Sequence, residues 1–311
     1  MDAIERPSPP GRPPLDTPPG HQPGGAPSRV PGRPAGRPAA SLKRLAALLK
    51  SCHPGPTVVV TLLVAGLAVA AGQDTPGCVL ATAAVLAGQL SVGWSNDAVD
   101  AVRDTAVGRG DKPVAGGAVG ARTVRNAALV ALVLCVPLSL LYGLLAGAVH
   151  LAGVLAAWAY NFGLKSTPLS WLPYAIGFAS LPAFVTLGLP GAATPAWWIV
   201  TAAALVGVGA HLGNVLPDIE ADLATGVRGW PQRLGPTAVR LLLPLPLVAA
   251  TILLALGRPG ALGAVAVGVA LVAAVGGAVL GSRRPKLPFL AAIVVAAADV
   301  TLLLTQGAAL S

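Results

Sequence analysis

The sequence predicts an all-helical integral membrane protein with about nine transmembrane helices. Of its 311 residues, 54% are hydrophobic and only 11% are charged, whereas soluble domains carry about 25% charged residues. The mean hydropathy is +0.73 over the whole chain. Long apolar runs recur along the sequence, and each approaches the ~20 residues that a helix needs to cross a bilayer. The runs lack the polar–apolar alternation of a membrane β-barrel. An ordinary soluble enzyme is therefore excluded.

Nine runs qualify as candidate spans, and short connections rich in Gly and Pro separate them. They cover residues 43–71, 78–102, 120–145, 147–163, 169–188, 196–217, 236–257, 260–280 and 288–309. Each is predicted to be helical because backbone polar groups in lipid must be satisfied within the segment. Lys43, Arg44 and Lys50 predict an amphipathic start to the first run. His53 and Pro54 predict a kink in that run.

The first forty residues form a separate region in this prediction. Residues 1–40 are rich in Pro, Gly and Arg and cannot bury enough apolar area to offset their ordering entropy. We expect a disordered cytoplasmic tail followed by one membrane domain over residues 41–311. Two interpretations of the tail stay open: its arginines bind anionic lipid headgroups, or it is an extension without a specific partner.

Positively charged residues predict the orientation in the membrane. Twelve Lys and Arg residues lie in the connections that follow the second, fourth, sixth and eighth runs, and only Arg258 lies in the opposite connections. This bias places the amino terminus in the cytoplasm and the carboxyl terminus outside. The net charge of +9 therefore reflects topology and the tail. No basic face with interleaved aromatic residues exists, so no nucleic-acid partner is expected.

Acidic residues are scarce, and their positions are informative. The chain has twelve, and six of them fall within two short clusters, residues 96–104 and 214–222. Both clusters lie at the predicted cytoplasmic ends of spans. The spacing i, i+3, i+7 places three acids of the first cluster on one helical face: Asp97, Asp100 and Asp104. In the second cluster, the spacing i, i+4, i+8 places one amide and two acids on one helical face: Asn214, Asp218 and Asp222.

Carboxylates stacked at membrane depth repel one another and need a counter-ion. A hard divalent cation fits, because Mg²⁺ is held by one or two carboxylates together with substrate phosphates. Two facing clusters therefore indicate Mg²⁺ ions that bridge a diphosphate, with nearby basic residues on the same oxygens. The alternative, ordinary solvated helix ends, is disfavoured by the scarcity of acids elsewhere.

At these residues the sequence resembles the UbiA-type intramembrane prenyltransferase superfamily. The first cluster matches its NDxxDxxxD pattern at Asn96, Asp97, Asp100 and Asp104. The second cluster matches its DxxxD pattern at Asp218 and Asp222, and residues 160–165 look like its Tyr…Leu-Lys segment. The resemblance covers roughly residues 41–311.

The resemblance implies a helical bundle around a central cavity that opens laterally to lipid. It implies an integral membrane enzyme whose active site faces the cytoplasm. The enzyme would transfer a prenyl chain from a prenyl diphosphate to a small, often aromatic, acceptor through Mg²⁺-assisted ionisation to an allylic cation. Metal ions and cations stabilise the departing diphosphate, and an apolar cavity keeps water from the cation.

The resemblance also assigns residues. The implied catalytic residues are Asp97, Asp100, Asp104, Asp218 and Asp222. The implied Mg²⁺ ligands are these five together with Asn96. The implied substrate-binding residues are Asn96, Arg109, Lys112, Tyr160, Lys165 and Asn214. Lys112 stands where the family usually has Arg, and Thr105 replaces the Arg that usually follows the last acid of the first motif.

Two further polar residues lie within predicted spans. His211 shares a helical stripe with Asn214 and Asp218, and it either touches the acceptor or is a neutral cavity-lining residue. Asp299 is expected to be a protonated or hydrogen-bonded structural residue.

Alternative functions stay open at this point. A membrane terpene cyclase of the same superfamily would keep the same Asp motifs, and only the need for an acceptor distinguishes it from a transferase. A transporter that couples ions through the acids is disfavoured, because the acids lie at span ends on one side.

Overall fold

The structure is a computed structural model that describes residues 37–191, 194–280, 284 and 286–306. These residues form helices joined by turns and loops, with no strand among them. The predicted tail lies outside the described residues, except for residues 37–40, where the first helix begins. The all-helical fold class predicted from the sequence is thus confirmed.

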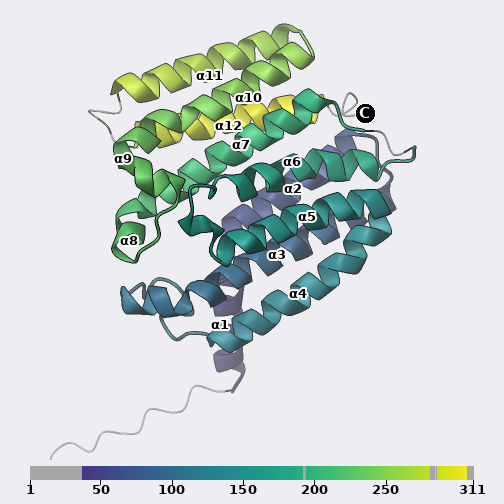
Figure 1. Cartoon of the computed structure of the whole chain (residues 1–311). Coiled ribbons are helices and arrows are strands. Elements are labelled where there is room, and N and C mark those ends of the chain that lie inside the picture. The colour runs from purple at the N-terminus through teal and green to yellow at the C-terminus, as the bar shows by residue number, and fades with distance from the viewer. Residues whose placement is uncertain (1–36, 192–193, 281–283, 285, 307–311) are drawn as a thin grey trace, which may run out of the picture.

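The helices follow one another with short connections (Figure 1). Their bounds are α1 Arg37–Lys50, α2 Pro54–Ala70, α3 Thr75–Ala106, α4 Ala121–Tyr142, α5 Leu144–Asn161, α6 Leu172–Leu187, α7 Trp197–Val215, α8 Ile219–Ala224, α9 Trp230–Leu242, α10 Pro244–Gly257, α11 Ala261–Leu280 and α12 Leu287–Thr305. Two short 3₁₀ helices, η1 Leu164–Ser166 and η2 Leu216–Asp218, complete the set.

Each of the nine predicted runs contains a helix, but two runs are not single straight spans. Among the described residues, six helices are long and apolar enough to cross a membrane, and two bent pairs raise the number to eight. The first run bends by 65° between α1 and α2, and the seventh is replaced by α9 and α10 with a bend of 48°. The fifth run forms α6, a shorter apolar helix of 16 residues.

The spans form a closed ring with two helices outside it. Consecutive contacts run from α2 to α3, α5, α6, α7, α10 and α12, and α12 packs back against α2. Helix α4 packs outside on α3 and α5, and α11 packs outside on α10 and α12, at opposite edges of Figure 1. Buried Leu67, Phe184, Leu254 and Leu302 belong to the core that joins these helices. Many exposed side chains of α4 and α11 are Val and Leu, as expected for surfaces that face lipid.

Polar segments gather at one end of the ring. Several segments lie together at the left of Figure 1: the carboxyl ends of α3, α5 and α7, the short helix α8, and the α3–α4 and α8–α9 connections. These segments carry both acidic clusters, so the fold brings the two motifs to one end of the bundle.

Close helix approach depends on small residues at several contacts. In α5, a Cβ added at Gly147 would lie 2.5 Å from the backbone oxygen of Ser139 in α4. In α11, by contrast, a Cβ at Gly268 would meet nothing within 4 Å. The hairpin between α4 and α5 therefore requires glycine, whereas the α11 position does not.

We expect Gly147→Ala to lower the thermal stability of the purified protein, since overpacking against backbone costs about 1–3 kcal/mol. Gly268→Ala is the matched control and should be neutral or slightly stabilising, because Ala is the better helix former. The measurement is the melting temperature of each variant in the same detergent. Equal melting temperatures for the two variants would contradict the packing described for this hairpin.

Candidate active site

A cavity of about 510 Å³ opens at the polar end of the ring. Its walls come from α2, α3, α5, α6, α7 and α8. The deeper part is mainly apolar and includes Val60, Val154, Phe178 and Leu181. Four carboxylates line the outer part: Asp100, Asp104, Asp218 and Asp222. The cavity thus joins a charged head to an apolar interior.

The first motif presents two buried carboxylates to this cavity, and both are neutralised by cations. Lys165 Nζ donates to Oδ1 of Asp100, and Arg103 Nη2 donates to Oδ2 at 2.9 Å. Lys112 Nζ lies 2.7 Å from Oδ2 of Asp104. The cations come from η1, from α3 itself and from the α3–α4 connection, so three segments converge on one helical turn.

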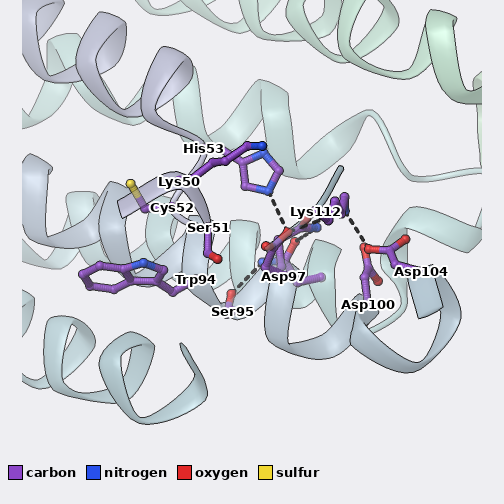
Figure 2. Close-up of polar contacts among 12 residues, drawn as sticks. Lys50, Ser51, Cys52, His53, Trp94, Ser95, Asp97, Asp100, Asp104 and Lys112 are labelled. Carbon is purple, nitrogen blue, oxygen red and sulfur yellow. Dashed lines mark hydrogen bonds and ion pairs between the residues drawn. The ribbon is translucent and has the colours of Figure 1, made fainter. Parts of the chain in front are cut away.

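Asp97 differs from the other acids of its motif. It is 3% exposed and is not among the residues that line the cavity. Its Oδ1 lies 3.6 Å from Lys112 Nζ and 3.3 Å from His53 Nε2 (Figure 2). Its Oδ2 is buried without a hydrogen-bond partner among the described residues.

The second motif lies where α7 ends. Helix α7 stops at Val215, and a 3₁₀ turn that contains Pro217 leads through Asp218 into α8. Proline has no backbone N–H and disrupts the helical hydrogen-bond ladder, which explains the change of helix type. The break presents Asp218 and Asp222 to the cavity on successive turns.

Each acid of the second motif has a partner from a distant segment. Arg109 Nη1, in the α3–α4 connection, lies 3.3 Å from Oδ1 of Asp218. Gln232 Nε2, in α9, donates to Oδ2 of Asp222 at 2.8 Å. Arg109 Nε also lies 3.3 Å from Oδ1 of Asp111, which lowers the pKa of that carboxyl. Through Arg109, the connection that follows the first motif therefore contacts the second motif.

The α8–α9 connection passes very close to η1. A Cβ at Gly229 would lie 2.3 Å from the backbone oxygen of Lys165. Ser170 Oγ accepts a hydrogen bond from the backbone N–H of Trp230 at 3.0 Å. Gly229 therefore allows this connection to lie against η1, with Lys165 facing the first motif and Gln232 facing the second.

Burial affects the protonation of Lys165. Desolvation lowers the pKa of its ammonium group from the ordinary value, and the charge of Asp100 opposes that decrease. An anionic ligand that approaches Lys165 would favour its charged form in the same way.

Amide and aromatic side chains form the rest of the outer wall. Asn96 Nδ2 donates to Oδ1 of Asn161 at 3.1 Å, and Asn161 Nδ2 donates to Ser95 Oγ at 2.6 Å. Tyr160 and Asn214 both line the cavity. The predicted substrate-binding residues other than His211 therefore gather at one opening.

His211 lies behind this wall. It is 1% exposed and does not line the cavity. Its Nε2 lies 3.1 Å from Ser170 Oγ, and its ring packs against Tyr160 and Tyr174. Its position supports a structural role over direct contact with an acceptor.

Asp299 does not line the cavity. It is fully buried in α12, and its Oδ1 accepts a hydrogen bond from Thr251 Oγ1 of α10 at 2.6 Å. The expectation of a hydrogen-bonded acid is confirmed.

The donor set at the cavity head suits Mg²⁺. The carboxylate and amide oxygens of Asp100, Asp104, Asp218, Asp222 and Asn214 line it, and oxygen is the donor that Mg²⁺ prefers. Among the described residues, no group of three or more His, Cys, Asp or Glu is arranged to hold a metal ion by itself. The carboxylates instead face Lys, Arg and Gln side chains. This arrangement suits metal ions that arrive with phosphate oxygens.

Sequence reasoning missed four residues at this site: His53, Arg103, Asn161 and Gln232. His53 was interpreted only as part of a kink, and its place beside Asp97 depends on the packing of α2 against α3. Arg103 offered a usable signal, since it lies three residues after Asp100 on the same helix. Gln232 offered none, because a loop brings it to Asp222.

The fold and the site define a helical membrane protein with a cavity that acidic and basic side chains line at its mouth and apolar side chains line further in. A sequence model of the UbiA prenyltransferase family matches residues 58–301. The chain therefore belongs to the UbiA prenyltransferase family.

The chain is also similar to an individual curated protein. A "Bacteriochlorophyll synthase 33 kDa chain" from Cereibacter sphaeroides is 34% identical over 167 residues. That match covers 49% of this chain and 53% of the relative, so the chain spans about half the length of the curated relative it matches.

Solved structures share the fold. A UbiA homologue from Archaeoglobus fulgidus bound to GPP and Mg²⁺ has a TM-score of 0.63 at 16% identity, covering 84% of this chain and 99% of that one. An apo UbiA homologue from Aeropyrum pernix has a TM-score of 0.61 at 20% identity, and the match covers 78% of this chain and 97% of that one. A digeranylgeranylglyceryl phosphate synthase has a TM-score of 0.62 at 16% identity, covering 86% and 99%.

We expect Lys112→Met to destabilise the protein, because it leaves Asp97 and Asp104 without their shared cation. Breaking a fully buried pair costs 3–5 kcal/mol, and about 1–3 kcal/mol is expected here because the cavity admits water. Added Mg²⁺ should raise the melting temperature of this variant more than that of the wild type. Lys112→Arg is the control and should behave like the wild type. The same Mg²⁺ response in all three proteins would contradict the electrostatic role of Lys112.

Proposed function

We propose that this chain is an integral membrane prenyltransferase that transfers a prenyl chain from a prenyl diphosphate to a small acceptor, with Mg²⁺ as cofactor. Its membership of the UbiA prenyltransferase family supports the reaction class. The acceptor is proposed to be aromatic, and the similarity to a bacteriochlorophyll synthase supports including a bacteriochlorophyll-type pigment among the candidates.

One observation carries the proposal. Four carboxylates and four cations, supplied by segments far apart in the sequence, meet at the mouth of an apolar cavity within the membrane domain. The cations are Arg103, Arg109, Lys112 and Lys165. Acids and bases in equal number at one opening suit a ligand that arrives as a metal–diphosphate, with an apolar chain for the interior.

Each group then has a chemical task. Lys112, Lys165, Arg103 and Arg109 would bind diphosphate oxygens through charge-assisted hydrogen bonds. The acids of both motifs, with Asn96 and Asn214 in support, would hold Mg²⁺, which neutralises the charge that develops on the leaving diphosphate. These acids are Asp97, Asp100, Asp104, Asp218 and Asp222. The apolar depth would hold the prenyl chain and keep water from the reacting carbon.

The site is proposed to face the cytoplasm, with the amino terminus on the same side. The cavity mouth lies at the end of the bundle that carries the basic α3–α4, α5–α6 and α8–α9 connections. Basic connections favour the cytoplasmic side. A prenyl chain could then stay at membrane depth while its diphosphate is exposed to cytoplasmic Mg²⁺.

Diphosphate release from the detergent-purified protein tests the function. Geranyl, farnesyl and geranylgeranyl diphosphate would each be offered with Mg²⁺, with and without a panel of aromatic and pigment acceptors. Release that needs an acceptor supports the transferase. Release without an acceptor and with a cyclic product would replace it by a terpene cyclase. Absence of release with every donor would contradict the proposal for these substrates.

We expect Asp100→Asn and Asp218→Asn each to reduce Mg²⁺-dependent turnover by roughly 100-fold or more, the scale of losing one electrostatic stabiliser. Glu220→Gln is the matched control: Glu220 lies between Asp218 and Asp222 in sequence, yet it is exposed and does not line the cavity. It should retain wild-type turnover. Full activity in either Asp variant, with intact folding, would contradict the two-motif site.

A further inference from the structure

The break between α1 and α2 has an unusual backbone. His53 stands in the left-handed region, with φ 56° and ψ 67°. A non-glycine residue there is uncommon and carries a conformational cost. Pro54 and Gly55 follow directly and would suffice to end α1. Gly would adopt this conformation without that cost, whereas His places an imidazole at this position.

The break is held firmly against the first motif. Trp94 Nε1 of α3 donates to the backbone oxygen of Leu48 at 2.8 Å. Lys50 Nζ donates to the backbone oxygen of Asp111, in the α3–α4 connection, at 2.9 Å. A Cβ at Gly93 would lie 2.2 Å from the backbone oxygen of Cys52, so α3 carries glycine where the break crosses it. These contacts fix the position of His53 from both sides.

The imidazole then faces Asp97. In Figure 2, His53 and Lys112 approach the Asp97 carboxylate, Lys112 from the direction of Asp104. His53 lines the cavity, whereas Asp97 does not. His53 therefore connects the cavity lining to the first acid of the motif.

Two buried polar atoms at this contact are unsatisfied. Nε2 of His53 lies 3.3 Å from Oδ1 of Asp97 without the alignment of a hydrogen bond, and Oδ2 of Asp97 has no partner among the described residues. Buried polar atoms in native proteins are normally hydrogen-bonded. Both atoms lie in the first motif's neighbourhood, so the arrangement fits a site whose partners are completed on ligand binding.

The contacts of Lys112 indicate how the surroundings of Asp97 would change when a diphosphate binds. Its Nζ lies 3.6 Å from Oδ1 of Asp97 and 2.7 Å from Oδ2 of Asp104. If Lys112 turns to a phosphate oxygen, Asp97 loses its nearest cation while it stays buried. His53 is then the remaining neighbour that can donate to its Oδ1.

We propose that His53 is a positioning residue of the diphosphate site: by donating from Nε2 to Oδ1 of Asp97, it orients that carboxylate and leaves Oδ2 for the metal–diphosphate. The inference rests on the proposed function. Its chemistry is that of a histidine paired with a carboxylate beside a metal site, where the supporting partner sets ligand orientation.

The test compares His53→Ala with His53→Gln. Both replacements bear a similar left-handed backbone cost, but only Gln keeps an N–H donor near the position of Nε2. Metal affinity would be measured without turnover, by electron paramagnetic resonance of Mn²⁺ titrated into protein saturated with geranyl thiolodiphosphate. The Mg²⁺ concentration for half-maximal turnover and the KM for the donor would be measured in parallel.

We expect His53→Ala to weaken Mn²⁺ binding by about 10–100-fold, the usual effect of removing a supporting partner, and His53→Gln to stay within about threefold of wild type. The KM for the donor should change less than the Mg²⁺ requirement. Trp94→Phe is the control for the docking of the break: it loses the bond to Leu48. The Lys50 bond to Asp111 and the close approach of Cys52 to Gly93 still hold the break, so the metal affinity should stay close to that of the wild type.

Wild-type Mn²⁺ affinity in His53→Ala would overturn the inference, as would equal losses in the Ala and Gln variants. If His53→Ala fails to fold, His53→Asn replaces it in the comparison and should show the same loss of Mn²⁺ affinity. Asn tolerates the left-handed backbone but is too short to reach Asp97 in the same way. Absence of Mn²⁺ binding by wild-type protein with the thiolodiphosphate would contradict the proposed function itself, which separates the two failures.

Discussion

The cost of burying carboxylates at the edge of a membrane domain governs the structure of this protein's polar end. Asp97, Asp100 and Asp104 are each at most 5% exposed. Uncompensated charges in such surroundings are very unfavourable. Lys165 pairs with Asp100, Arg103 with Asp100 and Asp104, and Lys112 with Asp97 and Asp104, and these cations come from three different segments. The connections fold inward because the acids need their cations.

This requirement also links the two motifs. Arg109 comes from the connection after the first motif and meets Asp218 in the second, and Gln232 comes from beyond the second motif and meets Asp222. The same groups can exchange a carboxylate partner for a phosphate partner, because both offer anionic oxygens that accept charge-assisted hydrogen bonds. Under the proposed function, a site neutralised in this way would accept a metal–diphosphate without a large change in net charge.

Much of this arrangement could be predicted, because hydropathy and helical spacing are local properties. The nine runs each contain a helix, and the spacing of Asp100 and Asp104 places both in the cavity. The bend after α1 lies at His53 and Pro54, where the sequence predicts a kink. The break between α9 and α10 at Leu243 could not be placed, because residues 236–257 form one continuous apolar run. Gln232 and His53 reach the site only through tertiary packing, which no local pattern encodes.

An experimental structure with geranyl thiolodiphosphate and Mn²⁺ bound, with the metal located by its anomalous signal, tests the central claim most directly. The expected result is metal between the diphosphate and the carboxylates of both motifs, with Lys112 and Lys165 moved from Asp104 and Asp100 to diphosphate oxygens. Ion pairs that stay intact, with the diphosphate bound elsewhere, would contradict the claim that these acids and cations form one diphosphate site.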